Sequence, residues 1–255
     1  MNSHFPKLAA DALDMQRTAL FLDVDGTLLD IATTPDAVVV PDGLVSTIAK
    51  LERALGGALA IVTGRTLADL DRLFCPLRTR AAGVHGAEMR FDPEDVAVEA
   101  AGAAPLPEDL WREFAVATLA FPGARPENKR YSFTAHYRAA PQAAAPLRGA
   151  LQGLVARRAV GELELTDALC AYELKPAGVN KGAAVRRFLA RPPFAGRRPM
   201  FIGDDVSDEF GFRSVVDRRG LAFAVGAARV DVDHVFADPA SVRQWLARLA
   251  AQRAA

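Results

Sequence analysis

The sequence has few cysteines and no excess of charge of either sign. Its two cysteines, Cys75 and Cys170, lie far apart and in no metal-like spacing. We therefore expect two buried thiols in a reducing compartment rather than a structural disulfide. The chain has 31 basic and 31 acidic residues, whereas nucleic-acid binders normally carry a basic excess that meets phosphate charge. This balance argues against nucleic-acid binding.

Long apolar runs are also missing. No run reaches the roughly 20 residues that a membrane-spanning helix needs, and residues 1–20 lack the continuous apolar stretch of a signal peptide. About half of the residues are apolar, and 255 residues fit one large domain or one domain carrying a smaller one. We therefore expect a cytoplasmic protein, a monomer or weak dimer, that uses no membrane.

Several short apolar runs each end in a polar or glycine-containing turn. They span residues 18–24, 58–62, 199–202 and 221–225. Runs this continuous are typical of strands buried on both faces of a parallel sheet. Helical patterns lie between or beyond them, at residues 42–55, 66–74, 181–190 and 241–252. This order predicts an α/β fold, a Rossmann-like parallel sheet core with helices on both faces, which binds ligands beyond the carboxyl ends of its strands.

Two polar residues mark where the first two of these helices begin. Asp42 is a plausible N-cap of the helix at 42–55, and Thr66 stands at the start of the helix at 66–74. The first helix is expected to end at the glycine pair Gly56-Gly57.

The middle of the chain has a different pattern. After a break at 105–107 we expect a helix, a hairpin, a second helix and a second hairpin, over residues 108–120, 124–138, 142–158 and 162–174. The second hairpin is expected to turn at Asp167-Ala168. We therefore predict a core domain of residues 1–104 and 178–255, with an inserted α/β domain over 105–177.

The sharpest chemical signal is Asp23-Val24-Asp25-Gly26-Thr27. Side chains two residues apart in an extended segment point the same way, so Asp23 and Asp25 are expected to face one pocket. Two adjacent carboxylates repel, which suggests a cation between them or a shared proton. Mg²⁺ favours such oxygen ligands. One carboxylate could then attack phosphorus while the other transfers a proton; the alternative is an ordinary Asp-Gly turn.

A second acidic segment, Gly203–Glu209, follows another apolar run. Its four acidic groups crowd together, and a metal would remove the cost of that crowding. Asp204 at the strand end is our candidate ligand, and Asp205 and Asp208 are expected to orient ligands from behind. The alternative is a solvated acidic turn at a helix N-terminus.

Two further segments are weak signals alone. In Thr63-Gly64-Arg65 the hydroxyl could bind a phosphoryl oxygen and Gly64 could admit the ligand, although the segment may equally just lead into a helix. Lys181 could offset phosphate and carboxylate charge, or be an ordinary surface lysine. Taken together, these segments supply a nucleophile, a proton carrier, a metal ligand, a hydroxyl and a cation, which phosphoryl transfer requires.

These motifs resemble those of the haloacid dehalogenase-like phosphatases. The chain has DVDGT, VTGR, NKG and GDDVSDE in that family's order, at residues 23–27, 62–65, 180–182 and 203–209. The pieces AGVHGAE, FPGARPENKRYSFTAHYR and YELKPAGVNKG resemble more closely the trehalose-phosphate phosphatase branch, at residues 82–88, 121–138 and 172–182. The one small departure is Ser207, where the family usually has threonine.

The resemblance implies a Mg²⁺-dependent phosphatase whose substrate is trehalose 6-phosphate and whose inserted domain is a cap. Asp23 would be the nucleophile, and Asp25 the general acid and base with a backbone carbonyl on the metal. Thr63 and Lys181 would hold the phosphoryl group, and Asp23 and Asp204 the metal. The implied sugar and substrate contacts are Glu127, Lys129, Glu173, Gly64, Arg65 and His85. His85 could equally be structural.

Three alternatives stay open at this point. The substrate could be another sugar phosphate, such as sucrose phosphate or mannosylphosphoglycerate, since only the cap contacts would differ. The protein could instead be a phosphomutase. It could also be a sugar-phosphate sensor without turnover, although such a protein would be expected to lack at least one of the groups named above.

Overall fold

The computed structural model describes residues 13–32, 37–95, 99–100, 104–158, 162–168, 170–229 and 231–251. The chain divides into two compact units. The first comprises Met1–Glu99 and Asn180–Ala255, and the second comprises Ala100–Val179. No helix in the described ranges is long and apolar enough to cross a membrane.

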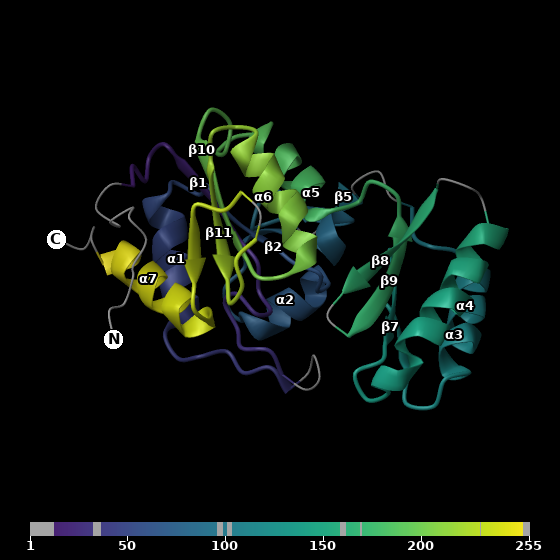
Figure 1. The fold of residues 1–255 in the computed structure, drawn as a ribbon. Coiled ribbons are helices and arrows are strands. Elements are labelled where there is room, and N and C mark those ends of the chain that lie inside the picture. Colours follow the sequence, from purple (N-terminus) through teal and green to yellow (C-terminus); the bar gives the residue numbers. More distant parts are fainter. Residues whose placement is uncertain are drawn as a thin grey trace. The chain divides into compact units, whose positions relative to one another are not determined.

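The first unit is built on one large twisted sheet (Figure 1). Its strand order is β12-β11-β10-β1-β2-β3-β4-β5, in which β12 through β3 run parallel and β4 pairs antiparallel with β3. The strands are β1 (Thr18–Leu22), β2 (Leu59–Val62), β3 (Arg80–Gly83), β4 (Glu88–Arg90), β5 (Glu99–Ala100), β10 (Arg198–Gly203), β11 (Leu221–Val225) and β12 (His234–Phe236). The predicted Rossmann-like parallel core is confirmed.

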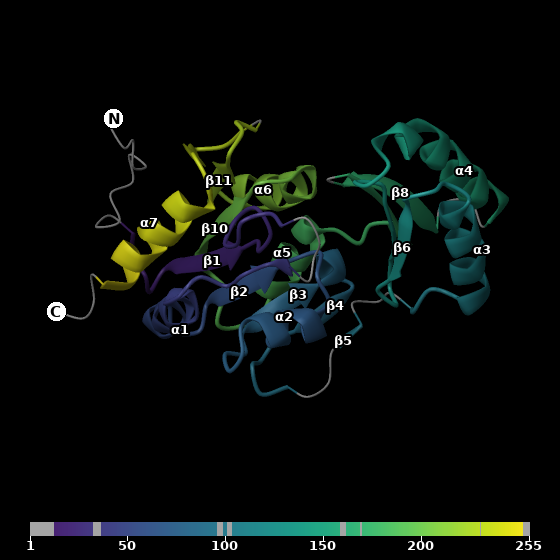
Figure 2. The ribbon, with the colours of Figure 1, turned by 90° about the horizontal axis from the view of Figure 1, so that it is seen from below.

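The central strands are buried along their whole length, as their continuous apolar runs predict. Every residue of β1, β2 and β11 is buried. Helices cover both faces of the sheet, with α1 and α7 packed together on one side and α5 and α6 on the other (Figures 1 and 2). The helices of this unit are α1 (Leu44–Ala54), α2 (Leu67–Leu73), α5 (Lys181–Leu189), α6 (Glu209–Val216) and α7 (Pro239–Ala251).

The start of α1 differs from the prediction. Gly43 is the N-cap, in a left-handed conformation with φ 79°, and no side chain caps the helix. Asp42 is therefore not the cap, because the left-handed glycine turns the chain one residue later. The prediction for Thr66 is confirmed, since its side chain accepts a hydrogen bond from the backbone N–H of Asp69 at 3.1 Å.

Four elements of this unit had no recognisable sequence signal. Strands β3, β4 and β12 are only three or four residues long and contain alanine, glycine or charged residues. Helix α6 has eight residues and follows directly on the acidic segment at 203–209. Short elements of mixed composition owe their structure to the neighbouring sheet rather than to their own periodicity.

The second unit is a four-stranded antiparallel sheet of order β6-β7-β9-β8, covered on one face by two helices (Figure 1). Its elements are α3 (Glu108–Leu119), β6 (Arg125–Asn128), β7 (Phe133–His136), α4 (Ala144–Arg157), β8 (Leu163–Ala168) and β9 (Ala171–Pro176). Alternate strand residues, among them Phe133 and Leu174, pack against Phe114 and Leu151 of the helices. The opposite face is polar.

Two expectations for this unit and for the thiols were wrong. Asp167 and Ala168 do not form the hairpin turn, because they continue β8 and pair with Tyr172 and Ala171. Both cysteines are free thiols, but Cys75 is exposed and Cys170 is half-buried. Each lies outside the strands and helices rather than in a core position.

Candidate active site

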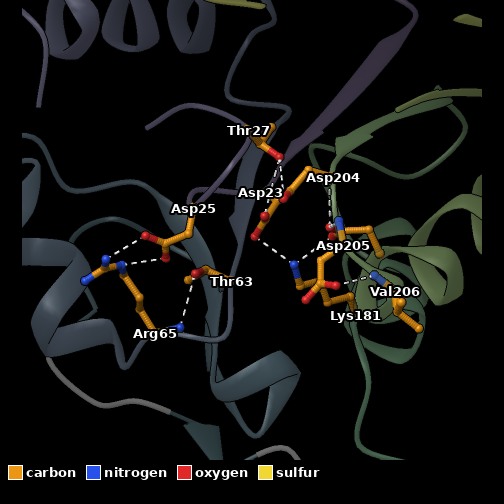
Figure 3. Close-up of polar contacts among 10 residues, drawn as sticks. Asp23, Asp25, Thr27, Thr63, Arg65, Lys181, Asp204, Asp205 and Val206 are labelled. Atoms are coloured by element: carbon orange, nitrogen blue, oxygen red, sulfur yellow. Dashed lines mark hydrogen bonds and ion pairs between the residues drawn. The ribbon is translucent and has the colours of Figure 1, made fainter. Parts of the chain in front are cut away.

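The centre of the first unit's polar edge is a lysine between two aspartates. Asp23 follows β1 and is buried, with 4% exposure. Nζ of Lys181, at the start of α5, lies 2.7 Å from Oδ1 of Asp23 and 2.7 Å from Oδ1 of Asp208 (Figure 3). Burial alone would lower the pKa of Lys181, but the charges of Asp208 and Asp23 raise it. Lys181 is therefore a buried, permanently charged cation and not an ordinary surface lysine.

Asp204 comes to the same place from the end of β10. Its carboxylate lies against Gly26, where an added Cβ would fall 2.0 Å from Oδ2 of Asp204. Oγ1 of Thr27 lies 3.4 Å from Oδ2 of Asp23 and 3.2 Å from Oδ1 of Asp204, and so links the two carboxylates (Figure 3). The turn after β1 thus needs a glycine for close approach and a hydroxyl for alignment.

Asp208 is fully engaged by donors from this chain. Oδ1 accepts from Lys181, and Oδ2 accepts from the backbone N–H groups of Asp204 at 3.1 Å and of Asp205 at 3.0 Å. Asp205 itself caps the following 3-10 turn, where its Oδ1 accepts from the N–H of Val206 at 2.6 Å. Both residues therefore shape the backbone that presents Asp204.

The acidic cluster has the chemistry of a divalent-cation site. Oxygens of Asp23, Asp204 and Asp208 all lie within 4.8 Å of one another. Burial raises the pKa of Asp23 well above its ordinary range, and the charge of Asp208 raises it further. The same two causes raise the pKa of Asp204 to about 6. Because one lysine faces three carboxylates, an oxygen-preferring cation such as Mg²⁺ fits the surplus of negative charge, with Asp23 and Asp204 as its ligands.

Asp25 points away from this cluster and toward Arg65 (Figure 3). Nε and Nη2 of Arg65 bind its two carboxylate oxygens at 2.7 and 2.6 Å. The backbone N–H of Arg65 also donates to Oγ1 of Thr63 at 3.1 Å, and Thr63 is buried at the end of β2. Arg65 therefore fixes a catalytic candidate on each of two neighbouring strand ends.

His85 lies beside the same strand end. An added Cβ on Gly64 would fall 2.7 Å from Cε1 and Nε2 of His85, so the glycine is required for the imidazole to lie there. The backbone N–H of His85 donates to the carbonyl of Thr63 at 2.9 Å. His85 and the preceding Val84 both have positive φ, 55° and 46°. This sparsely populated conformation in a β-branched residue is a sign of a site held by its surroundings.

The predicted sugar contacts lie in the second unit, on the polar face of its sheet. Oε2 of Glu127 lies 2.7 Å from Nε2 of His136 and 3.9 Å from Nζ of Lys129. Glu173 is buried and its Oε1 accepts from the hydroxyl of Ser132 at 2.7 Å. These three candidates thus belong to an organised hydrogen-bonded surface and not to a loosely solvated hairpin.

Sequence reasoning missed several residues that shape these sites. Arg229, after β11, donates from Nη2 to the backbone carbonyl of Asp204 at 2.8 Å. His136 and Ser132 bind the two glutamates of the cap. A single arginine, histidine or serine gives no distinctive pattern in sequence. Thr27 could have been found, because it stands beside Gly26 in the DVDGT segment.

The chain was compared with known protein families and curated proteins. The family model described as trehalose-phosphatase matches residues 21–241. The chain is 45% identical over 219 residues to a Sinorhizobium fredii (strain NBRC 101917 / NGR234) protein named "Probable trehalose-phosphate phosphatase", covering 86% of this chain and 82% of that protein. It is 37% identical over 232 residues to the "Trehalose-6-phosphate phosphatase" of Escherichia coli (strain K12), covering 89% and 85%.

The chain belongs to the trehalose-phosphatase family. Among solved structures, the C-terminal domain of Candida albicans trehalose-6-phosphate phosphatase is similar to this member, with a TM-score of 0.81 at 25% identity, covering 92% of each chain. The family resemblance expected from the motifs is confirmed. Members of this family are phosphoric monoester hydrolases, so this trehalose-phosphatase is an enzyme by its relatives.

Proposed function

We propose that this chain hydrolyses trehalose 6-phosphate to trehalose and phosphate through an aspartyl phosphate on Asp23, with Mg²⁺ as the cofactor. The observation that carries the proposal is the convergence of Asp23, Lys181 and Asp204 within a chain of the trehalose-phosphatase family. A buried carboxylate with a cation on one side and a second carboxylate on the other is suited to phosphoryl transfer.

In the first step, a carboxylate oxygen of Asp23 attacks phosphorus and the bond from phosphorus to the sugar oxygen breaks. Asp25, in its protonated form, gives its proton to that oxygen, and trehalose leaves. Lys181 and the hydroxyl of Thr63 hold the phosphoryl oxygens. Bound between Asp23 and Asp204, Mg²⁺ would shield the negative charges that meet there.

In the second step, the Asp25 carboxylate takes a proton from water and the water oxygen attacks phosphorus. The bond from phosphorus to Asp23 breaks, which releases phosphate and restores both aspartates. The reaction as a whole consumes one water. Asp205 and Asp208 take no part in bond changes and support the loop that carries Asp204.

The second unit would act as the cap that selects the sugar, with its domain at 105–177 and hinges near Pro105 and Pro176–Gly178. Glu127, Lys129 and Glu173 would hold sugar hydroxyls, because carboxylates accept and the ammonium group donates hydrogen bonds. Gly64, Arg65 and His85 would line the substrate side of the first unit. Such a lid admits water late and holds the sugar early.

Phosphate release from trehalose 6-phosphate, glucose 6-phosphate and sucrose 6-phosphate tests this proposal. We expect turnover with the first substrate in Mg²⁺, none in EDTA, and loss of turnover in Asp23→Asn. Asp14→Asn is a matched control, since Asp14 lies before β1 and away from the polar edge of the sheet. Turnover that survives Asp23→Asn would overturn the mechanism.

Other outcomes would identify the alternatives. Preference for sucrose phosphate or mannosylphosphoglycerate would keep the chemistry and change the substrate. An isomeric sugar phosphate in place of free phosphate would indicate a phosphomutase, and tight binding without turnover would indicate a sensor. We also propose a cytoplasmic monomer or weak dimer, which sedimentation at several concentrations would test.

A further inference from the structure

The polar face of the second unit's sheet carries a buried hydroxyl with no hydrogen-bond partner among the described residues. Thr134 is 4% exposed, and its Oγ1 is one of the few buried side-chain atoms that no described group meets. A buried hydroxyl without a partner has a free-energy cost, so such groups are uncommon unless a ligand uses them.

Strand register places this hydroxyl between the two glutamates of the proposed sugar site. Thr134 on β7 pairs with Glu127 on β6 and with Glu173 on β9. Residues paired across antiparallel strands project from the same face, with Cβ atoms about 4.5–5.5 Å apart. The short threonine therefore stands between two longer carboxylate side chains in one row across the sheet.

The neighbouring charges indicate what kind of ligand fits this row. Two glutamates flank the hydroxyl, which disfavours an anion. Lys129 lies 3.9 Å from Glu127, and the buried Lys175 follows Glu173 by two residues on the same face, which disfavours a cation. Carboxylates require donors, whereas a threonine hydroxyl can both donate and accept. A neutral molecule with neighbouring hydroxyls meets all of these requirements.

We propose that Thr134 is a further sugar-binding residue, whose hydroxyl pairs with a hydroxyl of the trehalose moiety held between Glu127 and Glu173. This inference rests on the proposed function and adds a contact to it. The long side chains of the two glutamates flank Thr134 and turn toward the sugar as it enters. The cost of the unpaired hydroxyl in the free protein is recovered when the sugar binds.

Thr134→Val tests the proposal, because it removes the hydroxyl and keeps the branched shape. We expect the KM for trehalose 6-phosphate and the inhibition constant for trehalose to rise about fivefold, the value of one uncharged hydrogen bond. The inhibition constant for inorganic phosphate should stay unchanged. The Tm should rise, because the variant no longer buries an unpaired hydroxyl. Thr134→Ser should restore the wild-type KM.

Thr118→Val is the matched control in the same unit. Thr118 is fully buried in α3, and its Oγ1 donates to the carbonyl of Phe114 at 2.8 Å. The same substitution there should lower the Tm and leave both inhibition constants unchanged. A structural role for Thr134 would give this pattern in place of a higher Tm with weaker sugar binding.

The outcomes separate this inference from the proposed function. Turnover of trehalose 6-phosphate by the wild type, with unchanged KM in Thr134→Val, would overturn the inference alone. A lower Tm in Thr134→Val, or an equal rise in the inhibition constant for phosphate, would also overturn it. No turnover by the wild type would overturn both proposals.

Discussion

The guanidinium of Arg65 binds both carboxylate oxygens of Asp25, through Nε at 2.7 Å and Nη2 at 2.6 Å. Arg65 is 9% exposed, whereas 40% of the Asp25 side chain is exposed. The buried partner therefore fixes the orientation of the accessible one. Burial alone would lower the pKa of Arg65, but the hydrogen bonds and charge of Asp25 raise it, so the pair stays intact across the working pH range.

Arg65→Met should lower kcat about 10–100-fold, because Asp25 would lose the orientation in which it transfers protons. The measurement is steady-state phosphate release at saturating Mg²⁺. Arg72→Met is the control, since Arg72 is 62% exposed and pairs with Asp69 on the surface of α2. A wild-type kcat in Arg65→Met would show that the pair has no role in turnover.

Gly26→Ala should abolish measurable activity and Mg²⁺ binding. Its added Cβ would lie 2.0 Å from Oδ2 of Asp204, so the carboxylate would have to leave the cluster. Gly226→Ala is a close control, because Gly226 has the same φ of 76° and no atom lies within 4 Å of its added Cβ. Both variants bear the backbone cost of about 1–2 kcal/mol, and only the first loses the site. Calorimetric Mg²⁺ titration distinguishes them.

Arg229→Met should raise the Mg²⁺ concentration for half-maximal activity about tenfold. Arg229 fixes the backbone carbonyl of Asp204, and residues that orient a metal ligand typically contribute this much to affinity. Arg213→Met is the control, because Arg213 also pairs with Glu209 but is 71% exposed on α6. Equal Mg²⁺ requirements in the two variants would contradict this role.

Glu127 should make the stability of the second unit depend on pH. Burial and the charge of Glu173 would raise the pKa of Glu127, but the hydrogen bond from His136 and the charge of Lys129 lower it below 4.5. A depressed pKa in the folded state means that the stabilisation is present above pH 4.5 and is lost as the pH falls through the folded pKa. Glu127→Gln should therefore be less stable than wild type at pH 7, with the difference vanishing toward pH 3.

Urea unfolding at several pH values checks this expectation. The two tryptophans, Trp111 in α3 and Trp245 in α7, belong to different units, so a Trp245→Phe background lets Trp111 report on the second unit alone. His136→Asn should remove most of the pH dependence. A difference between wild type and Glu127→Gln that stays constant from pH 7 to pH 3 would refute the role of the pair.

The strongest predictions came from segments whose pattern repeats a physical requirement. The runs at 58–62 and 221–225 correspond to β2 and β11 because strands buried on both faces need continuous apolar side chains. Thr66 could be assigned as a cap because its bond is local in sequence. Asp42 could not be excluded in the same way, since the left-handed turn at Gly43 is a backbone choice that many sequences permit.

The sequence by itself determined the parallel sheet, the inserted unit and the set of acidic and basic groups at the strand ends, because apolar periodicity and motif order are local properties of the chain. Only the tertiary structure decided which groups meet. It paired Lys181 with Asp208 across 27 residues and Arg65 with Asp25 across 40, and it left the hydroxyl of Thr134 between two glutamates from other strands. Such pairings depend on strand order and register, which arise when distant segments pack together.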